Sequence, residues 1–401
     1  MIKKIAGGVT APQGFVAGGL ACGIKPNQQA DLALIYSEIP AQAGGLFTTN
    51  QVQAAPVIVS KRHLQAGVAQ AIIANSGNAN ACNGPEGEDA AIAMAQAAAD
   101  FLKIDPRMVL IASTGVIGVR LPVERIQAAL AAQPRFLSSN GSSMAARAIM
   151  TTDTFIKEIA VEFELDGVKT RIGGIAKGSG MIHPNLATML GFITTDAAID
   201  ASLLQKALGV AGDYSFNRVT VDGDTSTNDT LLILANGKAQ NTVINQENEA
   251  YQLFLEALKL VCLELAKMLV RDGEGASKFV EIKVTGAGSE TEALQVGKTI
   301  ATSNLVKTAL FGEDANWGRI LAAAGYSGVA LRPELINIYL GDLLVCRGGT
   351  GLDFDEARAK AILGQKELLI TVDLGSGNQE ASVWTCDLTY DYVKINGSYR
   401  S

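Results

Sequence analysis

Thr188 lies where a glycine-rich loop gives way to an apolar stretch, within segment 177–196, KGSGMIHPNLATMLGFITTD. A small residue, Ala187, precedes it, and from Thr188 onward the sequence alternates like a buried strand. This arrangement suits a chain that cuts itself between Ala187 and Thr188 and so frees the amine of the threonine. One residue would then carry both a nucleophilic hydroxyl and its own base.

The amine of an N-terminal threonine is a base suited to neutral pH. An α-amine has an ordinary pKa of about 7.7–8.0, so a useful fraction is unprotonated near neutrality. Gly178 and Gly180 tolerate backbone angles that other residues avoid, and Pro184 fixes its own φ and restricts His183. Such a loop could strain the peptide before Thr188 and favour an N→O acyl shift. From these residues alone, the alternative is an ordinary glycine-rich turn before a core strand.

Composition narrows the chemical options. The chain has 401 residues, of which 48% are hydrophobic, and its net charge of -7 argues against general nucleic-acid binding. With only His63 and His183 present, a histidine-rich metal site is excluded, and a Ser-His-Asp or Cys-His enzyme would have to use one of them. Five scattered cysteines without a CxxC pair predict reduced thiols in a cytoplasmic protein. No apolar run is long enough to span a bilayer.

A second chemical candidate is the end of a predicted strand, Met108–Ala112, which stops at Ser113-Thr114-Gly115. Backbone N–H groups are left free at such an end, and the Thr114 hydroxyl adds another donor. Donors of this kind form an oxyanion hole, which stabilises charge that develops only in the transition state. The alternative is a simple turn at the end of the strand.

Three polar segments could line a pocket around these groups. They are the loop 75–84 (NSGNANACNG), the acidic loop 222–229 (DGDTSTND) and the tail 396–401 (NGSYRS). The alternatives are a long connection with Asn in left-handed conformations for the first loop and a frayed end for the tail. The acidic loop resembles a cation site but lacks full EF-hand spacing, which favours a structural or pocket loop. Glu274, between two glycines at the end of a predicted helix, is well presented to a ligand; the alternative is a solvated acid at a helix cap.

Hydrophobic periodicity predicts an α/β chain that would position these residues. Strands are predicted at Leu32–Ser37, Pro56–Ser60, Gln70–Ala74, Met108–Ala112, Ile156–Phe163, Val168–Ala176, Met189–Thr195 and Leu231–Ala235. Helices are predicted at Glu86–Leu102, Pro122–Ala132, Ser142–Met150, Asp200–Leu208 and Asn245–Arg271, the last with Asn245 as its N-cap.

The pattern changes at Phe279, where a smaller C-terminal α/β domain is expected. Its predicted elements are strands Phe279–Thr285, Leu335–Leu340, Leu368–Leu374 and Ala381–Ile395, and helices Glu290–Ala309 and Phe354–Ile362. We therefore expect a catalytic core at 1–278 and a smaller domain at 279–401 that contributes its tail to the site.

Over essentially its whole length the chain resembles the ornithine acetyltransferases of arginine biosynthesis, also called glutamate N-acetyltransferases. The segments that carry the resemblance are GVTAPQGF, NSGNANACNG, STGVIG, TTDTF, KGSGMIHPNLATMLGFITTD, DGDTSTND, DGEGASKF, FGEDANWGRI and NGSYRS. So many matches in order are highly specific. The resemblance implies mixed sheets sandwiched between helices, as in the self-processing L-aminopeptidases and ornithine acetyltransferases.

The resemblance also implies residue roles. The chain is expected to cut itself between Ala187 and Thr188 into fragments 1–187 and 188–401 that stay together, and Thr188 accepts the acetyl group. Thr114 and Gly115 match the positions that stabilise the oxyanion. The matching substrate-binding positions are Thr154, Lys177, Thr188, Glu274, Asn396 and Ser401. The side chains suit these roles, since a lysine can pair with an α-carboxylate and a glutamate with an ammonium group.

The implied reaction is ping-pong: N2-acetyl-L-ornithine acetylates Thr188, and L-glutamate then takes the acetyl group. Family members differ in whether acetyl-CoA also acylates the threonine, and the sequence leaves that choice open. The resemblance implies no metal and no organic cofactor, and a heterotetramer of two processed protomers. Two rivals remain at this point: a self-processing hydrolase in which water resolves the acyl-enzyme, and a non-catalytic amino-acid-binding or scaffold protein that stays uncleaved.

Overall fold

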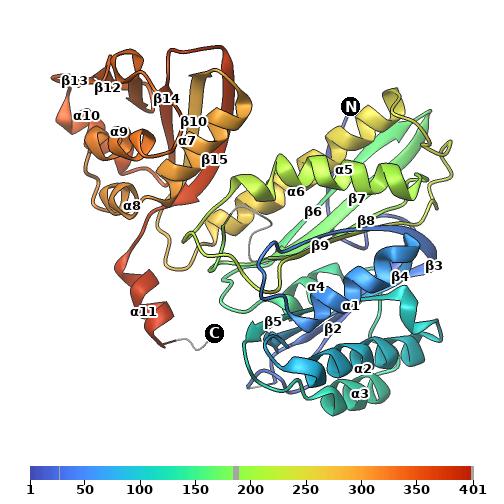
Figure 1. Cartoon of the computed structure of the whole chain (residues 1–401). Helices are drawn as coiled ribbons and strands as arrows, with labels where there is room; N and C mark the ends of the chain where they lie inside the picture. Colours follow the sequence, from blue (N-terminus) through green and yellow to red (C-terminus); the bar gives the residue numbers. More distant parts are fainter. Residues whose placement is uncertain (27, 184–188, 399–401) are drawn as a thin grey trace.

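The computed structural model describes residues 1–26, 28–183 and 189–398 (Figure 1). Within these residues, nine strands form one mixed sheet in the order β1-β6-β7-β8-β9-β3-β4-β5, with β2 paired to β3. Their bounds are β1 Lys3–Ile5, β2 Phe15–Leu20, β3 Leu32–Phe47, β4 Val68–Asn78, β5 Val109–Val116, β6 Lys157–Leu165, β7 Val168–Lys177, β8 Leu190–Thr195 and β9 Thr230–Ala235.

Helices cover both faces of this sheet. They are α1 Ala55–His63, α2 Gly84–Leu102, α3 Val123–Ala132, α4 Ser142–Ile149, α5 Ala201–Asp213 and α6 Glu249–Arg271. Alternate residues of a strand point to opposite faces: in β9, Leu232 joins the buried cluster that contains α4, whereas Ile233 joins the cluster under α5 and α6. In β4, Ile73 faces a third cluster under α1, α2 and α3. The expected fold of mixed sheets between helices is confirmed.

A second sheet begins at Phe279 and has the strand order β13-β12-β11-β14-β10-β15. The bounds are β10 Phe279–Ala287, β11 Asn337–Leu340, β12 Leu343–Arg347, β13 Thr350–Gly351, β14 Glu367–Asp373 and β15 Gln379–Cys386. Its helices are α7 Glu290–Thr302, α8 Asn304–Phe311, α9 Trp317–Gly325 and α10 Glu356–Leu363. This sheet has an apolar core of its own, in which Val284, Ile300 and Ile338 are completely buried. No helix in the described part of the chain could cross a membrane.

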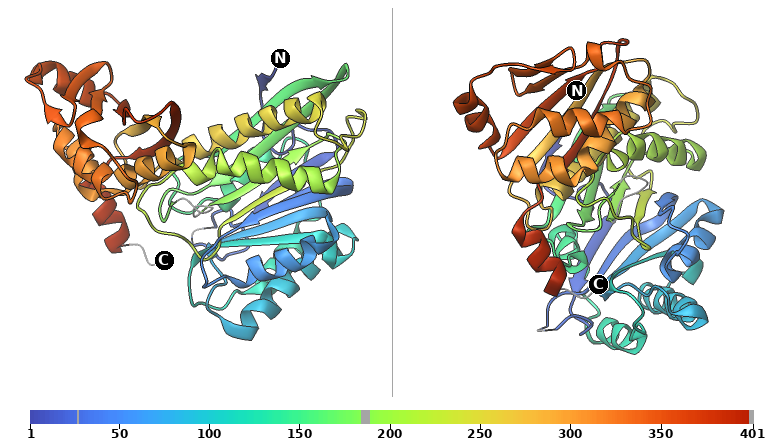
Figure 2. Two further views of the ribbon diagram at one scale, coloured as in Figure 1. Left: turned by 45° about the horizontal axis from the view of Figure 1, so that its top comes forward. Right: turned by 60° about the vertical axis from the view of Figure 1, so that its left-hand side comes forward.

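The strand predicted at Ala381–Ile395 is wrong beyond Cys386. After β15 the chain forms helix α11 (Tyr390–Ser398), which extends from the second sheet back toward the first (Figures 1 and 2). The cap of α11 explains the change, because the Thr389 hydroxyl accepts a hydrogen bond from the N–H of Tyr392 at 3.3 Å. The same hydroxyl donates to the carbonyl of Gly275 at 2.7 Å, and so ties α11 to the loop after α6.

Three smaller predictions also differ from the structure. The strand predicted at Pro56–Ser60 is part of helix α1, whose first turn contains the proline, a position that tolerates its missing N–H. The helix predicted at Glu290–Ala309 is divided by Ser303, whose side chain accepts from the N–H of Val306 and starts α8. The N-cap of α6 is Asn248, three residues after the one predicted.

Candidate functional site

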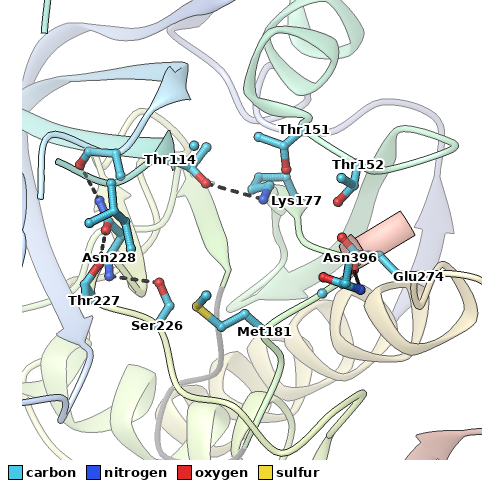
Figure 3. Close-up of a pocket in the computed structure, with 14 residues that line it drawn as sticks. Thr114, Thr151, Thr152, Lys177, Met181, Ser226, Thr227, Asn228, Glu274 and Asn396 are labelled. Carbon is cyan, nitrogen blue, oxygen red and sulfur yellow. Dashed lines mark hydrogen bonds between the residues drawn. The ribbon is translucent and has the colours of Figure 1, made fainter. Parts of the chain in front are cut away.

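A pocket opens where the ends of β5 and β7 meet the loop after α6 and the helix α11 (Figure 3). It holds about 620 Å³ of empty space, part of which is open to solvent. The polar residues that line it are Thr114, Gly115, Thr151, Thr152, Lys177, Gly180, Ser226, Thr227, Asn228, Glu274 and Asn396. The structure therefore brings together five residues that the sequence had singled out separately.

Thr114 and Gly115 lie at the end of β5, against the neighbouring strand β4. Gly115 has a φ of +133°, and a Cβ there would lie 2.3 Å from the carbonyl carbon of Gly77, so only glycine fits. The amide of Asn228 donates to the carbonyl of Ser113 at 2.9 Å. Because the peptide bond is planar and trans, fixing that carbonyl also fixes the direction of the Thr114 N–H. This is the rigid, preset donor geometry that an oxyanion hole requires.

Lys177 is the last residue of β7, and its side chain reaches the pocket with only 4% of the residue exposed. Its ammonium group donates to the Thr114 hydroxyl at 3.4 Å (Figure 3). Burial lowers the pKa of Lys177, and the nearby carboxylates of Asp153, Glu274 and Asp229 act in the opposite direction. An ammonium group with this environment is well placed to bind a carboxylate that enters the pocket.

Glu274 supplies the opposite charge. It follows α6 and is 9% exposed, and its carboxylate accepts a hydrogen bond from the side-chain amide of Asn396 at 2.7 Å. Its backbone N–H donates to the carbonyl of Ser179 at 2.8 Å, which ties it to the glycine-rich loop. A Cβ on Gly180 would lie 2.4 Å from the Glu274 carboxyl carbon, so glycine permits this close approach. A buried cation and a carboxylate thus share one pocket, as a zwitterionic ligand requires.

Thr154 is placed differently from the other predicted residues. Its N–H and its hydroxyl both donate to the carboxylate of Asp272, and it lines a neighbouring pocket with Arg271 and Lys394. In the described residues, Thr151 and Thr152 line the main pocket instead. The run 151–154, TTDT, contains three threonines, but the sequence does not show which of their hydroxyl groups faces the pocket.

Ala187, Thr188 and Ser401, which carry the predicted cleavage site, nucleophile and last substrate contact, lie outside the described residues. Met189, which follows Thr188, donates its N–H to Asp229 at 3.1 Å. Asp229 is almost completely buried, and this burial raises its pKa well above the usual range despite the nearby charge of Lys177. Sequence reasoning identified the acidic loop that contains Asp229 but gave this residue no role.

A buried ionic cluster supports the floor of the site. Lys157 pairs with Asp153 at 2.6 Å and with Asp272 at 2.5 Å, and all three side chains are at most 1% exposed. Asp153 also accepts from the N–H of Gly178 at 2.7 Å, which fixes the start of the glycine-rich loop. Although burial alone would raise the pKa of Asp153, Lys177 and Lys157 lower it to about 2.

No group of three or more His, Cys, Asp or Glu side chains in the described residues is arranged to hold a metal ion. Among the described residues, the pocket is lined by hydrogen-bonding side chains, the ammonium group of Lys177 and the carboxylate of Glu274.

Comparison with known proteins identifies relatives along the whole chain. An "Arginine biosynthesis bifunctional protein ArgJ" from Symbiobacterium thermophilum is 53% identical and covers 100% of both chains. An "Arginine biosynthesis bifunctional protein ArgJ 1" from Clostridium acetobutylicum is 52% identical over 96% of both chains. A crystal structure of ArgJ from Bacillus halodurans is 47% identical, with a TM-score of 0.51, and covers 52% of this chain and 98% of the solved chain. The ArgJ family model matches residues 16–401, and the chain therefore belongs to the ArgJ family.

Proposed function

We propose that this protein transfers the acetyl group of N2-acetyl-L-ornithine to L-glutamate in arginine biosynthesis, with Thr188 as the acetyl carrier. The pathway is supported by the name that its relatives share, arginine biosynthesis bifunctional protein. One observation carries the choice of ligand: Lys177 and Glu274 line one pocket beside Thr114 and Gly115. Together they complement the carboxylate and the ammonium group of an amino acid.

The proposed reaction has two half-reactions. The Thr188 hydroxyl attacks the acetyl carbonyl of N2-acetyl-L-ornithine, and its proton passes through the α-amine to the leaving nitrogen as the C–N bond breaks. Thr114 and Gly115 stabilise the oxyanion on the acetyl oxygen. Ornithine leaves, and the amine of L-glutamate then attacks the acetyl-Thr188 ester, which releases N-acetyl-L-glutamate and restores the hydroxyl.

A second acetyl donor is also part of the proposal. Both full-length relatives named above are called bifunctional, which supports a further source of acetyl groups. We infer that acetyl-CoA can acylate the same threonine, and that neither half-reaction requires a metal or an organic cofactor. Radioactive acetyl-CoA with L-glutamate should then yield labelled N-acetyl-L-glutamate in a reaction that Thr188→Ala abolishes.

The nucleophile requires cleavage between Ala187 and Thr188. The solved Bacillus halodurans chain corresponds to only 52% of this chain, a length that such a cleavage would produce. We infer that fragments 1–187 and 188–401 remain together, that residues 1–278 form the catalytic core, and that the domain 279–401 supplies Asn396. Two processed protomers would form a cytoplasmic heterotetramer, which light scattering of the purified protein can test.

The hydrolase rival is tested by following the fate of the acetyl group. With acetyl-labelled N2-acetyl-L-ornithine and L-glutamate, N-acetyl-L-glutamate should be the main product, and Thr188→Ser should retain part of the activity. Free acetate as the main product in the presence of L-glutamate would overturn the transferase assignment.

The binding-protein rival makes a different prediction, because it needs no cleavage. A denaturing gel of the purified protein should show two bands, and Thr188→Ala should show one. A single band from an active wild-type protein would overturn the proposed nucleophile.

A further inference from the structure

The acidic loop 222–229 contacts the chain on both sides of segment 183–188. On the upstream side, Asp222 accepts hydrogen bonds from the N–H groups of Met181 at 2.6 Å and of Ile182 at 2.9 Å. On the downstream side, Asp229 accepts from the N–H of Met189 at 3.1 Å. Two carboxylates of one short loop therefore hold the two ends of the segment that contains the Ala187–Thr188 peptide.

Carbonyl groups strengthen both attachments. The N–H of Val221 donates to the carbonyl of Ile182 at 2.8 Å, and the N–H of Thr230 donates to the carbonyl of Met189 at 3.0 Å. The Thr220 hydroxyl adds a second bond to the Ile182 carbonyl at 3.0 Å. Each end is thus held through both its N–H and its C=O, which fixes the position and the direction of the backbone there.

The loop that provides these contacts is itself tied to the first sheet. Asn228 donates to the carbonyl of Ala79 at 2.7 Å as well as to that of Ser113, next to the oxyanion donors. The Thr48 hydroxyl donates to the carbonyl of Ser226 at 2.6 Å, and the Asn50 amide donates to that of Thr225 at 3.1 Å. With its middle held in this way, the loop keeps a fixed separation between its two carboxylates.

The upstream attachment includes a strained residue. Met181 has a φ of +56°, in the left-handed region that a non-glycine residue rarely adopts, so its backbone is strained. Its N–H is the group that Asp222 holds at 2.6 Å. The contact with Asp222 therefore stabilises a backbone conformation that a free loop would leave.

The downstream attachment has spare acceptor capacity. The second carboxylate oxygen of Asp229 is buried and has no hydrogen-bond partner among the described residues. Asp229 therefore holds Met189 through one oxygen, whereas Asp222 binds the upstream side through both of its oxygens.

We propose that Asp222 and Asp229 act as paired anchors that hold segment 183–188 for self-cleavage, an inference that rests on the proposed processing at Thr188. In that step the Thr188 oxygen bonds to the Ala187 carbonyl carbon, the C–N bond breaks, and the hydroxyl proton passes to the freed amine. Water then hydrolyses the ester to the Ala187 carboxylate and the Thr188 hydroxyl. Both aspartates are positioning residues, because they bind backbone groups and exchange no atoms.

The test follows the cleavage of full-length protein on denaturing gels over time. In Asp222→Asn an amide NH2 must face one of the two backbone N–H groups that the carboxylate binds, and in Asp229→Asn the carboxylate that accepts from Met189 becomes an amide with only one accepting atom. Each variant should therefore be cleaved at least tenfold more slowly. Asp224→Asn is the matched control, because it makes the same substitution at an exposed residue of the same loop. Cleavage of Asp222→Asn or Asp229→Asn at the wild-type rate would overturn the proposal.

Two further measurements identify the step that the anchors affect and exclude misfolding as the cause of slow cleavage. Hydroxylamine cleaves esters, so it should not accelerate the two slow variants if the anchors act before the ester forms; restoration of the wild-type rate by hydroxylamine would contradict the proposal. Thr220→Val removes only one hydroxyl from the upstream anchor, and should slow cleavage several-fold while its unfolding midpoint stays near that of the wild type. An unchanged cleavage rate in this variant would also count against the anchors.

Failure of this inference is distinguishable from failure of the proposed function. If wild-type protein is cleaved but transfers no acetyl group, the acetyltransferase assignment fails while the anchors stand. If the aspartate variants are cleaved normally and wild type transfers acetyl groups, the anchors fail and the assignment stands.

Discussion

The side-chain amide of Asn396 donates to the Glu274 carboxylate at 2.7 Å, although 122 positions separate the two residues. Asn396 also donates to the carbonyl of Tyr392 at 3.1 Å, within its own helix α11, so its amide has a fixed orientation. This contact brings the C-terminal helix, which follows the second sheet, to the pocket of the first sheet.

Asn396→Ala should weaken substrate binding more than it slows the chemical step. A hydrogen bond to a charged group contributes about 1.5–3 kcal/mol, so KM for N2-acetyl-L-ornithine should rise roughly tenfold or more with kcat little changed. Steady-state kinetics provide the measurement. Ser398→Ala is the control, since among the described residues that hydroxyl donates only within α11, to the carbonyls of Lys394 and Ile395. A fall in kcat with unchanged KM would show that Glu274 does not hold the substrate through this contact.

Thr114→Val should lower kcat, because it removes the hydroxyl next to the oxyanion position and preserves the shape of the side chain. Loss of one oxyanion donor typically costs about 10²–10³ in kcat. Thr114→Ser keeps the hydroxyl and should retain most of the activity. Equal activities of the valine and serine variants would assign oxyanion stabilisation to backbone N–H groups alone.

Gly115→Ala should abolish activity or folding. The added carbon would lie 2.3 Å from the carbonyl carbon of Gly77 and 2.5 Å from the nitrogen of Asn78, both of them backbone atoms. Gly118→Ala is a sharp control, because Gly118 also has a positive φ, +75°, but a Cβ there meets nothing within 4 Å. Gly118→Ala should lower the free energy of unfolding by only about 1 kcal/mol, through backbone strain. Thermal unfolding and transfer assays of both variants would reveal whether the close approach, and not the dihedral angle, is what requires glycine.

The free energy of unfolding should fall in acid through Asp153. Its pKa is about 2 in the folded protein, below the ordinary value of 3.8, so the unfolded chain binds a proton first as pH falls. The stabilisation, roughly 2 kcal/mol, is complete above about pH 4 and is lost between about pH 4 and pH 2. Asp153→Asn should be less stable than wild type at pH 7 and should show a shallower loss over that range.

Urea unfolding at several pH values measures this effect. Asp166→Asn, in an exposed turn, is the control and should follow the wild-type curve. Parallel curves for wild type and Asp153→Asn would mean that Lys157 and Lys177 do not hold the carboxylate in its charged form.

The sequence was sufficient to predict most strands and helices of the core, because their apolar residues recur with regular periods. It failed where local signals conflict. The β-branched run Val57-Ile58-Val59 favours a strand, but α1 packs it against β5 as a helix. Beyond Cys386, the capping hydrogen bond of Thr389 starts a helix where a strand was predicted. The hydrophobic periodicity of the sequence contains no information about such a single hydrogen bond.

The candidate site was predicted in part. Thr114, Gly115, Lys177, Glu274 and Asn396 could be identified from ordered motifs, and the structure gathers them around one pocket. The attachments of Asp222 and Asp229 could not be foreseen, because they join loops about 40 residues apart. Such contacts depend on the register of β8 beside β9, which only the folded sheet defines.

Strands β7 and β8 are paired in the interior of the first sheet, from Ile172 opposite Thr195 to Lys177 opposite Leu190. A cut between Ala187 and Thr188 would place β7 and β8 on separate polypeptides, which the backbone hydrogen bonds between the two strands would still hold together. Denaturation would then become a dissociation, so the melting temperature of mature protein should rise with its concentration, whereas that of the uncut chain should not. After unfolding, the two fragments would have to meet again by diffusion. Refolding of the mature protein would therefore be bimolecular, whereas the uncut chain folds in a unimolecular reaction.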